Sequence, residues 1–116
     1  MAKILERVGP KVVLRHCRQL GLDIKTVSSC LGVHAKTLQR WQEGATQSHQ
    51  GAWRMMEKLE GICQSAMRLL KTEAQKSWFQ APNATLGGER PIELLRRGEL
   101  DQVRNVLGML EWGIYS

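Results

Sequence analysis

The chain has 116 residues, 42% hydrophobic side chains and a net charge of +6. This length allows one compact domain or two very small ones that share a helix, and the hydrophobic content argues against disorder. No apolar run reaches the length of a membrane span and charges interrupt the first twenty residues, so we expect a cytoplasmic protein without an export signal or membrane contact.

The positive charge is concentrated in the N-terminal half. Residues 1–44 carry eight Lys/Arg against three Asp/Glu, residues 45–80 carry five against three, and residues 81–116 carry four against five. A basic surface favours nucleic acid because each neutralised phosphate releases counterions. We therefore expect DNA as the partner of the N-terminal half and a protein as the partner of the C-terminal third.

Helical periodicity without strand-like alternation predicts an all-α fold throughout. In the N-terminal half, Gly9 ends one helix and Pro10 suits the first turn of the next. Asp23 is a candidate N-cap, and Gly32 a candidate C-cap. The helices expected here cover residues 2–8, 10–20, 24–31 and 35–43, the last closed by Gly44.

The second half is predicted to contain one long helix over residues 52–80, after a polar linker over residues 45–51. Its apolar residues recur at steps of three and four and form one stripe, which another element or a second copy of the chain must cover. The stripe consists of Ala52, Met55, Met56, Leu59, Ile62, Cys63, Ala66, Leu69 and Leu70. Pro82 ends the helical region, a loop follows at residues 86–88, and two further helices are expected over 91–97 and 100–112.

Residues 24–43 have the spacing of a helix-turn-helix. Apolar contacts between its two helices are expected from Val27, Leu31, Val33, Leu38 and Trp41, with a small residue at Ser28 and a left-handed turn at Gly32. The alternative interpretation is an ordinary helical corner in a protein that does not bind DNA.

If the motif binds DNA, the second helix enters the major groove. Its candidate base contacts are His34, Lys36, Thr37, Gln39 and Arg40. Gln39 can pair with adenine and Arg40 with guanine, whereas Lys36 suits either a base or a phosphate. Backbone contacts are expected from Lys25, Thr26, Thr46 and Gln47. Each of these side chains taken alone also fits a solvated surface.

Catalytic, metal or cofactor chemistry is not expected. The loop at Gly87-Gly88 lacks the strand and spacing of a phosphate-binding loop, and Cys30 and His34 have no second pair that would complete a metal site. Cys17, Cys30 and Cys63 are expected to be buried, reduced thiols. The acidic residues Glu89, Glu93, Glu99 and Asp101 are explained by helix-start charge and solubility. We therefore expect a protein that is not an enzyme and has no cofactor.

The last forty residues hold four of the six aromatic side chains, Trp78, Phe79, Trp112 and Tyr115. A terminal strip of Trp, Ile and Tyr is costly to leave in water, and such residues often anchor interfaces. Trp112 and Ile114 fit either an interface or a position folded back on the last helix as core.

Together with the helix-turn-helix, this segment closely resembles the Xre/MbcA/ParS family of antitoxins, and the resemblance covers essentially the whole chain. The matching residues are Trp78, Pro82-Asn83, Leu86-Gly87-Gly88, Arg90-Pro91, Leu94-Leu95, Gly98-Glu99, Val103, Leu107 and Glu111-Trp112-Gly113-Ile114. The resemblance implies a DNA-binding region over residues 1–48 and, over residues 49–116, a long connecting helix with a short helical toxin-binding domain.

The same resemblance implies a type II antitoxin that binds a RES-domain, NAD-consuming toxin with its C-terminus near the toxin active site and represses its own operon. The implied toxin-binding residues are Trp78, Arg90, Trp112, Gly113, Ile114, Tyr115 and Ser116. Small size, the apolar helix and the two half-sites of helix-turn-helix operators favour a homodimer, which would form a higher-order complex with the toxin. The alternative function is a stand-alone transcriptional regulator without a toxin.

Overall fold

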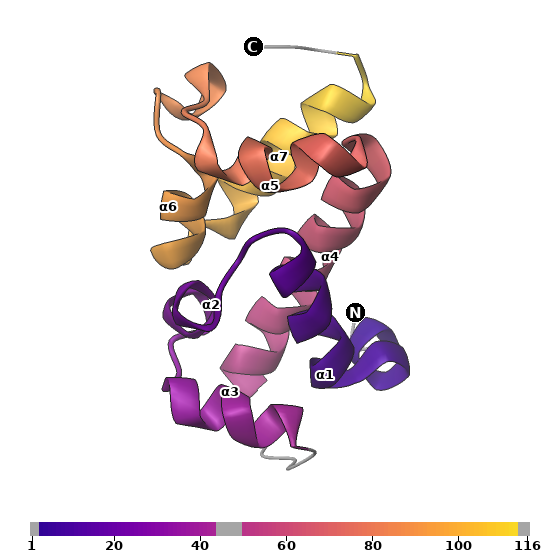
Figure 1. The fold of residues 1–116 in the computed structure, drawn as a ribbon, viewed down its shortest axis with the longest axis vertical. Helices are drawn as coiled ribbons and strands as arrows, with labels where there is room; N and C mark the ends of the chain where they lie inside the picture. The colour runs from indigo at the N-terminus through magenta and orange to yellow at the C-terminus, as the bar shows by residue number, and fades with distance from the viewer. Residues whose placement is uncertain (1–2, 44–49, 114–116) are drawn as a thin grey trace.

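The computed structural model describes residues 3–43 and 50–113, and its regular elements in these ranges are all helical (Figure 1). This confirms the all-α fold. The elements are α1 (Lys3–Gln19), α2 (Ile24–Leu31), α3 (Ala35–Gln42), α4 (Gln50–Leu69), α5 (Thr72–Gln80), the 3-10 turn η1 (Ala84–Leu86), α6 (Pro91–Arg96) and α7 (Leu100–Glu111). None of the described helices is long and apolar enough to cross a membrane.

The first two expected helices join into α1 with a kink between them. Gly9 lies at the kink with φ 71° and ψ 166°, outside helical geometry, and Pro10 follows in the next helical turn. A positive φ is readily adopted by glycine, which has no Cβ. The sequence therefore located the break correctly.

Helix α4 forms the centre of the fold, with α1 and α7 packed on it. The expected apolar stripe is covered by these two helices of the same chain: six of its residues are buried, Ala52, Met56, Leu59, Ile62, Cys63 and Ala66. The stripe thus needs no second copy of the chain, and the argument for a homodimer drawn from it was wrong.

The expectation of one unbroken helix over residues 52–80 was also wrong. Lys71 has φ −62° and ψ 148°, an extended conformation that separates α4 from α5. Gln75 is 4% exposed, and its Nε2 donates to the carbonyl of Leu70 at 3.2 Å, which satisfies an acceptor that the broken helix leaves free. The turn allows Phe79 to be fully buried while α5 packs on α6.

One hydrophobic core runs through both halves of the chain. It includes Val27 and Leu38 from the N-terminal half and Ile92 and Leu107 from the C-terminal half. Helix α2 packs against α4 and α6 as well as against α1 and α3. The predicted DNA-binding region therefore packs directly against the predicted toxin-binding domain and shares one core with it.

Candidate functional site

Helices α2 and α3 form the expected helix-turn-helix, and local signals set its turn. The Thr26 amide donates to Asp23 Oδ1 at 2.9 Å at the start of α2. Gly32 adopts the left-handed conformation at the end, with φ 69° and ψ 32°. Because a carboxylate that accepts a hydrogen bond is favoured in its charged form, the hydrogen bonds from Thr26 lower the pKa of Asp23.

The inner face of this motif is apolar, as predicted. Val27, Leu31, Leu38 and Trp41 are buried, and Val33 packs on them. Trp41 also stacks on Trp53 of α4, with ring centroids 5.5 Å apart and planes 11° apart. This stack ties the end of α3 to the start of α4. The role of Trp53 was not predicted from the sequence, although one tryptophan on each side of a short linker is a usable signal.

The outer face of α3 carries most of the predicted base contacts. His34, Lys36, Gln39 and Arg40 are exposed, and Thr37 is half-buried. Lys36, Gln39 and Arg40 stand at i, i+3 and i+4 and therefore share one side of the helix. Lys25 is exposed on α2. Thr46 and Gln47 lie outside the described residues.

Thr26 does not fit the predicted contact with the DNA backbone. Its side chain is 1% exposed, and its Oγ1 accepts a hydrogen bond from Arg96 Nε at 3.2 Å. A hydroxyl enclosed between α2 and α6 cannot reach a phosphate. The prediction was wrong because helical position alone did not reveal that α6 covers this side of α2.

The Asn83–Glu89 loop is a closed turn that leads into α6. The Asn83 side chain accepts from the Thr85 amide at 2.9 Å, and the Gly88 amide donates to the Asn83 carbonyl at 2.9 Å. Gly87 and Gly88 have φ values of 68° and 85°. The Pro-Asn and Gly-Gly pairs of the sequence thus shape a turn, as expected.

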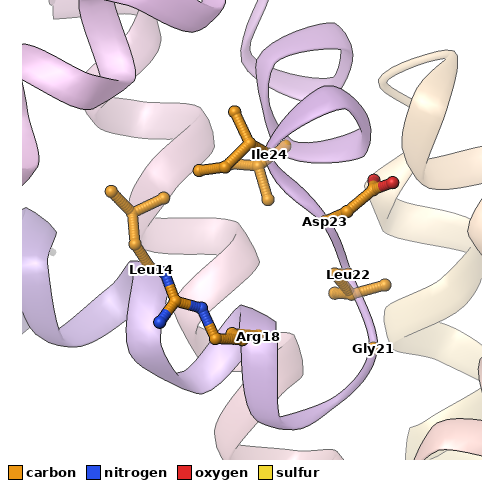
Figure 2. A pocket seen from close by; sticks show the side chains of 7 residues that line it. Leu14, Arg18, Gly21, Leu22, Asp23 and Ile24 are labelled. Carbon is orange, nitrogen blue, oxygen red and sulfur yellow. The ribbon is translucent and has the colours of Figure 1, made fainter.

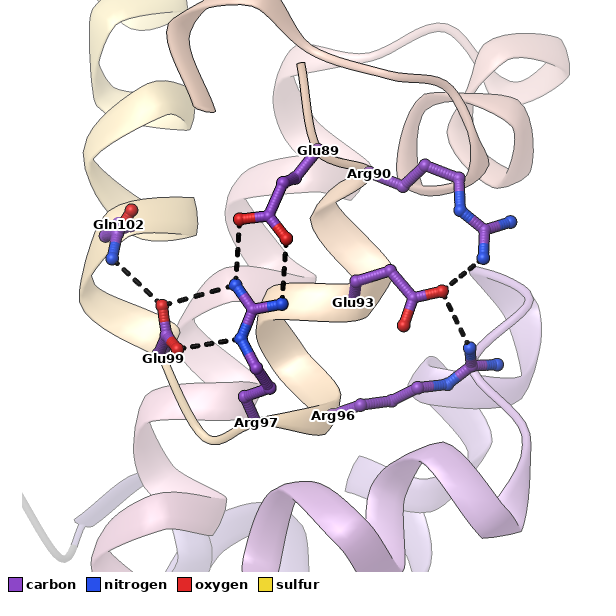
Figure 3. Close-up of polar contacts among 7 residues, drawn as sticks. All are labelled: Glu89, Arg90, Glu93, Arg96, Arg97, Glu99 and Gln102. Carbon is purple, nitrogen blue, oxygen red and sulfur yellow. Dashed lines mark hydrogen bonds and ion pairs between the residues drawn. The ribbon is translucent and has the colours of Figure 1, made fainter. Parts of the chain in front are cut away.

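Arginines and carboxylates form two separate clusters of ion pairs on and beside α6 (Figure 3). Arg97 binds both carboxylate oxygens of Glu89, at 2.8 and 2.9 Å, and also Glu99 at 2.8 Å. Arg90 and Arg96 both pair with Glu93. The hydrogen bond from Arg97 lowers the pKa of Glu89, and that from Arg90 lowers the pKa of Glu93.

These ion pairs correct the interpretation of Glu89, Glu93, Glu99 and Asp101 as helix-start charge and solubility alone. Through its ion pairs with Glu89 and Glu99, Arg97 connects the loop before α6 to the turn before α7 on the outer surface of the domain. Arg97 was not predicted from the sequence. The alternation of acids and arginines from Glu89 to Glu99 was the available signal.

The predicted toxin-binding residues do not gather at one point. Trp78 is half-buried against Phe79, with centroids 5.0 Å apart in an edge-to-face arrangement. Arg90 is half-buried and follows η1, whereas Trp112 ends α7. Figure 1 shows these two segments on opposite sides of α5. Ile114, Tyr115 and Ser116 lie outside the described residues.

Trp112 is exposed at the end of α7, which rules out a position in the core of this chain and leaves the interface role as a proposal. It is 80% exposed, and neighbouring Met109 is 37% exposed. Gly113 follows with φ 75°, and its amide donates to the Leu110 carbonyl at 3.1 Å, which closes the helix. An ion pair between Arg68 and Glu111 ties this helix end to α4. A large apolar ring held outward on a fixed helix end is available to a partner.

The three cysteines are buried and free, as predicted. Cys17 and Cys63 face each other across α1 and α4, with sulfurs 3.8 Å apart. Burial raises the pKa of Cys30 to about 12. No group of three or more potential metal-ligating side chains occurs in residues 3–43 and 50–113.

The chain is similar to known proteins both in sequence and in fold. Residues 65–113 match the family model described as the antitoxin Xre/MbcA/ParS C-terminal toxin-binding domain. The chain is also similar to a chain in the crystal structure of the M. tuberculosis MbcT-MbcA toxin-antitoxin complex, with a TM-score of 0.72 and 20% identity. That match covers 92% of this chain and 96% of the other, and at this identity it shows a shared fold. No curated protein matches the chain.

Proposed function

We propose that this chain, whose residues 65–113 match the model of the antitoxin Xre/MbcA/ParS C-terminal toxin-binding domain, is an antitoxin of that family and neutralises a toxin protein by binding it directly. The observation that carries the proposal is the 80% exposure of Trp112 at the end of the matched domain. Binding buries apolar area that the folded chain leaves in water, and a rigid aromatic anchor loses little conformational entropy on binding.

The proposed partner is a RES-domain toxin that consumes NAD. The segment from Trp112 to Ser116 would lie at or near the entrance of its active site. Trp112 and Gly113 start this segment from the closed end of α7, a helix fixed to α4 by the core and by the Arg68–Glu111 ion pair. The bound segment would then keep NAD out of the active site of the toxin, and this chain would contribute no catalytic group.

A second proposed activity is repression of the operon through the helix-turn-helix. Lys36, Gln39 and Arg40 lie together on the exposed side of α3, as a major-groove reader requires. Operators of such proteins commonly contain two half-sites, which is the remaining support for a homodimer and for a higher-order complex with the toxin. Sedimentation that shows a monomer both with and without operator DNA would remove the dimer.

The decisive experiment measures NAD consumption by the product of the adjacent gene, with and without this purified chain. We expect NAD loss with the neighbour alone, no loss with this chain alone, and protection at an equimolar ratio. The absence of NAD loss, or a loss that this chain does not stop, would refute the proposed antitoxin role. In that case operator binding alone would support a stand-alone regulator.

A further inference from the structure

Helix α1 carries a stripe of three cations outside the helix-turn-helix. Lys11, Arg15 and Arg18 are all exposed and stand at i, i+4 and i+7, so they share one side of the helix. The side toward the core carries Val13, Leu14, Cys17 and Leu20. We call Lys11, Arg15 and Arg18 the α1 stripe.

No acidic group compensates the α1 stripe within the described part of the chain. Residues 7–22 contain no Asp or Glu, and no ion pair to any of the three cations occurs among the described side chains of residues 9–43 and 51–113. Like charges four residues apart on a helix repel each other and destabilise it. The stripe therefore weakens the isolated helix and would be relieved by an external anion.

The C-terminal part of the chain is organised differently. Each arginine from Arg68 onward is paired with a carboxylate, in the pairs Arg68–Glu111, Arg90–Glu93, Arg96–Glu93, Arg97–Glu89 and Arg104–Asp101. The unpaired cations of α1 thus contrast with the paired arginines of the C-terminal part of the chain.

Asp23, which lines a cavity together with Arg18, is already used elsewhere. Arg18 and Asp23 both line a shallow cavity of about 280 Å³ between α1 and α2. Figure 2 shows Arg18 extending along this cavity and Asp23 pointing away from it. The Asp23 carboxylate accepts from the Thr26 amide as the cap of α2. Arg18 therefore remains available to an anion from outside.

The α1 stripe belongs to the same rigid unit as the recognition helix, because α1 packs directly on both α2 and α3. At 1.5 Å per residue, the stripe extends about 10 Å along its helix, the rise of about three nucleotides of a B-DNA strand. We propose that the α1 stripe is a second part of the DNA interface and contacts the phosphate backbone beside the base pairs that α3 reads.

This inference rests on the proposed DNA-binding function and deepens it. It assigns α1 the sequence-independent part of the binding, whereas Gln39 and Arg40 of α3 read the bases. Charge complementarity selects the phosphate backbone as the occupant, since the stripe offers three donors of one sign and no apolar anchor between them.

The test measures the affinity of the full chain for a short DNA duplex of mixed sequence, by fluorescence anisotropy at several salt concentrations. It compares the unchanged chain with the double variant Lys11→Gln/Arg15→Gln and with Arg18→Gln. Each lost phosphate contact should reduce the slope of log K against log salt by about 0.9, so we expect a reduction of about 2 for the double variant and about 1 for Arg18→Gln. Affinity should fall by at least about tenfold for the double variant at the lowest salt.

Two further variants separate the possible outcomes. Lys71→Gln/Lys76→Gln removes two exposed cations, one just before α5 and one in it, and should leave the slope unchanged. Lys36→Gln/Arg40→Gln on α3 should reduce it. A normal slope for the α1 variants with a reduced slope for the α3 variant would overturn this inference alone. A normal slope for both sets would overturn the assignment of α3 as well, and the absence of binding by the unchanged chain would overturn the DNA-binding function itself.

An equal loss in the α5 control would show that net charge, and not the stripe, controls binding, and it would also refute the inference. Thermal unfolding of each variant checks the fold. Removal of the mutual repulsion on α1 should leave the melting temperature of the stripe variants unchanged or higher. Weaker DNA binding from a protein of normal stability can then be attributed to lost contacts.

Discussion

Arg96 of α6 donates from Nε to the buried Oγ1 of Thr26 in α2 at 3.2 Å, across seventy residues of sequence. A second bond joins the same two helices, because the Ser29 hydroxyl donates to the Arg96 carbonyl at 2.7 Å. Arg96 also pairs with Glu93, which in turn pairs with Arg90. A chain of polar contacts therefore runs from a predicted toxin-binding residue to the first helix of the helix-turn-helix.

Replacement of Thr26 by valine should weaken this junction without disturbing its packing. Valine keeps the branched shape but removes the hydroxyl that accepts from Arg96 Nε and donates to Asp23, so we expect a loss of about 1 kcal/mol in the free energy of unfolding. Urea denaturation followed by circular dichroism measures it. Ser28→Ala on the same helix is the control, because its hydroxyl makes only a local bond to the Lys25 carbonyl. Equal stabilities for Thr26→Val and the unchanged chain would contradict the structural role of the junction.

Trp112→Ala should abolish much of the toxin affinity and leave the fold intact. The ring is 80% exposed, so its removal should change the unfolding free energy by less than about 0.5 kcal/mol. Loss of an aromatic anchor should weaken toxin binding by about 2 kcal/mol, roughly thirtyfold, as measured by calorimetric titration. Trp53→Ala should do the opposite: it removes the stack on Trp41 and costs stability, while the folded fraction still binds. Undiminished binding by Trp112→Ala would exclude this ring as an anchor.

The two binding activities should be separable by mutation. Gln39→Ala combined with Arg40→Ala removes two exposed polar groups of α3 and should abolish binding to the DNA upstream of the gene, with no change in protection against the toxin. Gel-shift and NAD-consumption assays of the same preparation measure both activities. Gln102→Ala, an exposed change on α7, is the control and should retain both. A concurrent loss of protection in the α3 variant would mean that the toxin also contacts the helix-turn-helix.

The cap of α2 should make a defined contribution to acid sensitivity. Asp23 has a pKa below its ordinary value of 3.8 because Thr26 donates to it. Its stabilising effect is therefore complete above that ordinary value and disappears as the pH falls through the lower pKa of the folded state. At neutral pH, Asp23→Ala should cost about 1 kcal/mol, and this difference should shrink below about pH 4.

Asp23→Asn separates the cap from its charge. The amide oxygen can still accept from the Thr26 amide, so most of the stability at neutral pH should remain. Because the amide does not titrate, this variant should not show the loss of stability below about pH 4 that protonation of Asp23 causes. Urea denaturation across the acid range compares the three proteins. A gap between Asp23→Ala and the unchanged chain that stays constant down to pH 2 would show that the carboxylate charge plays no part.

The sequence by itself determined the local structure of this protein. Asp23, Gly32 and Pro91 each act on the backbone within a few residues of themselves, and the helices begin or end there as predicted. The apolar faces followed from periodicity, because a helix buries residues at steps of three and four wherever it packs. The helix-turn-helix and the C-terminal family motif were also recognisable from the sequence, because both are patterns of residue types at short, fixed spacings.

Tertiary structure alone decided which elements meet. It ended α4 before Lys71 so that Phe79 could be buried, and it covered the apolar stripe with α1 and α7. It also enclosed Thr26 beneath α6 and left Trp112 outside the core. Burial and the choice of a polar partner depend on groups many tens of residues away, and a pattern read over a few helical turns carries no information about them.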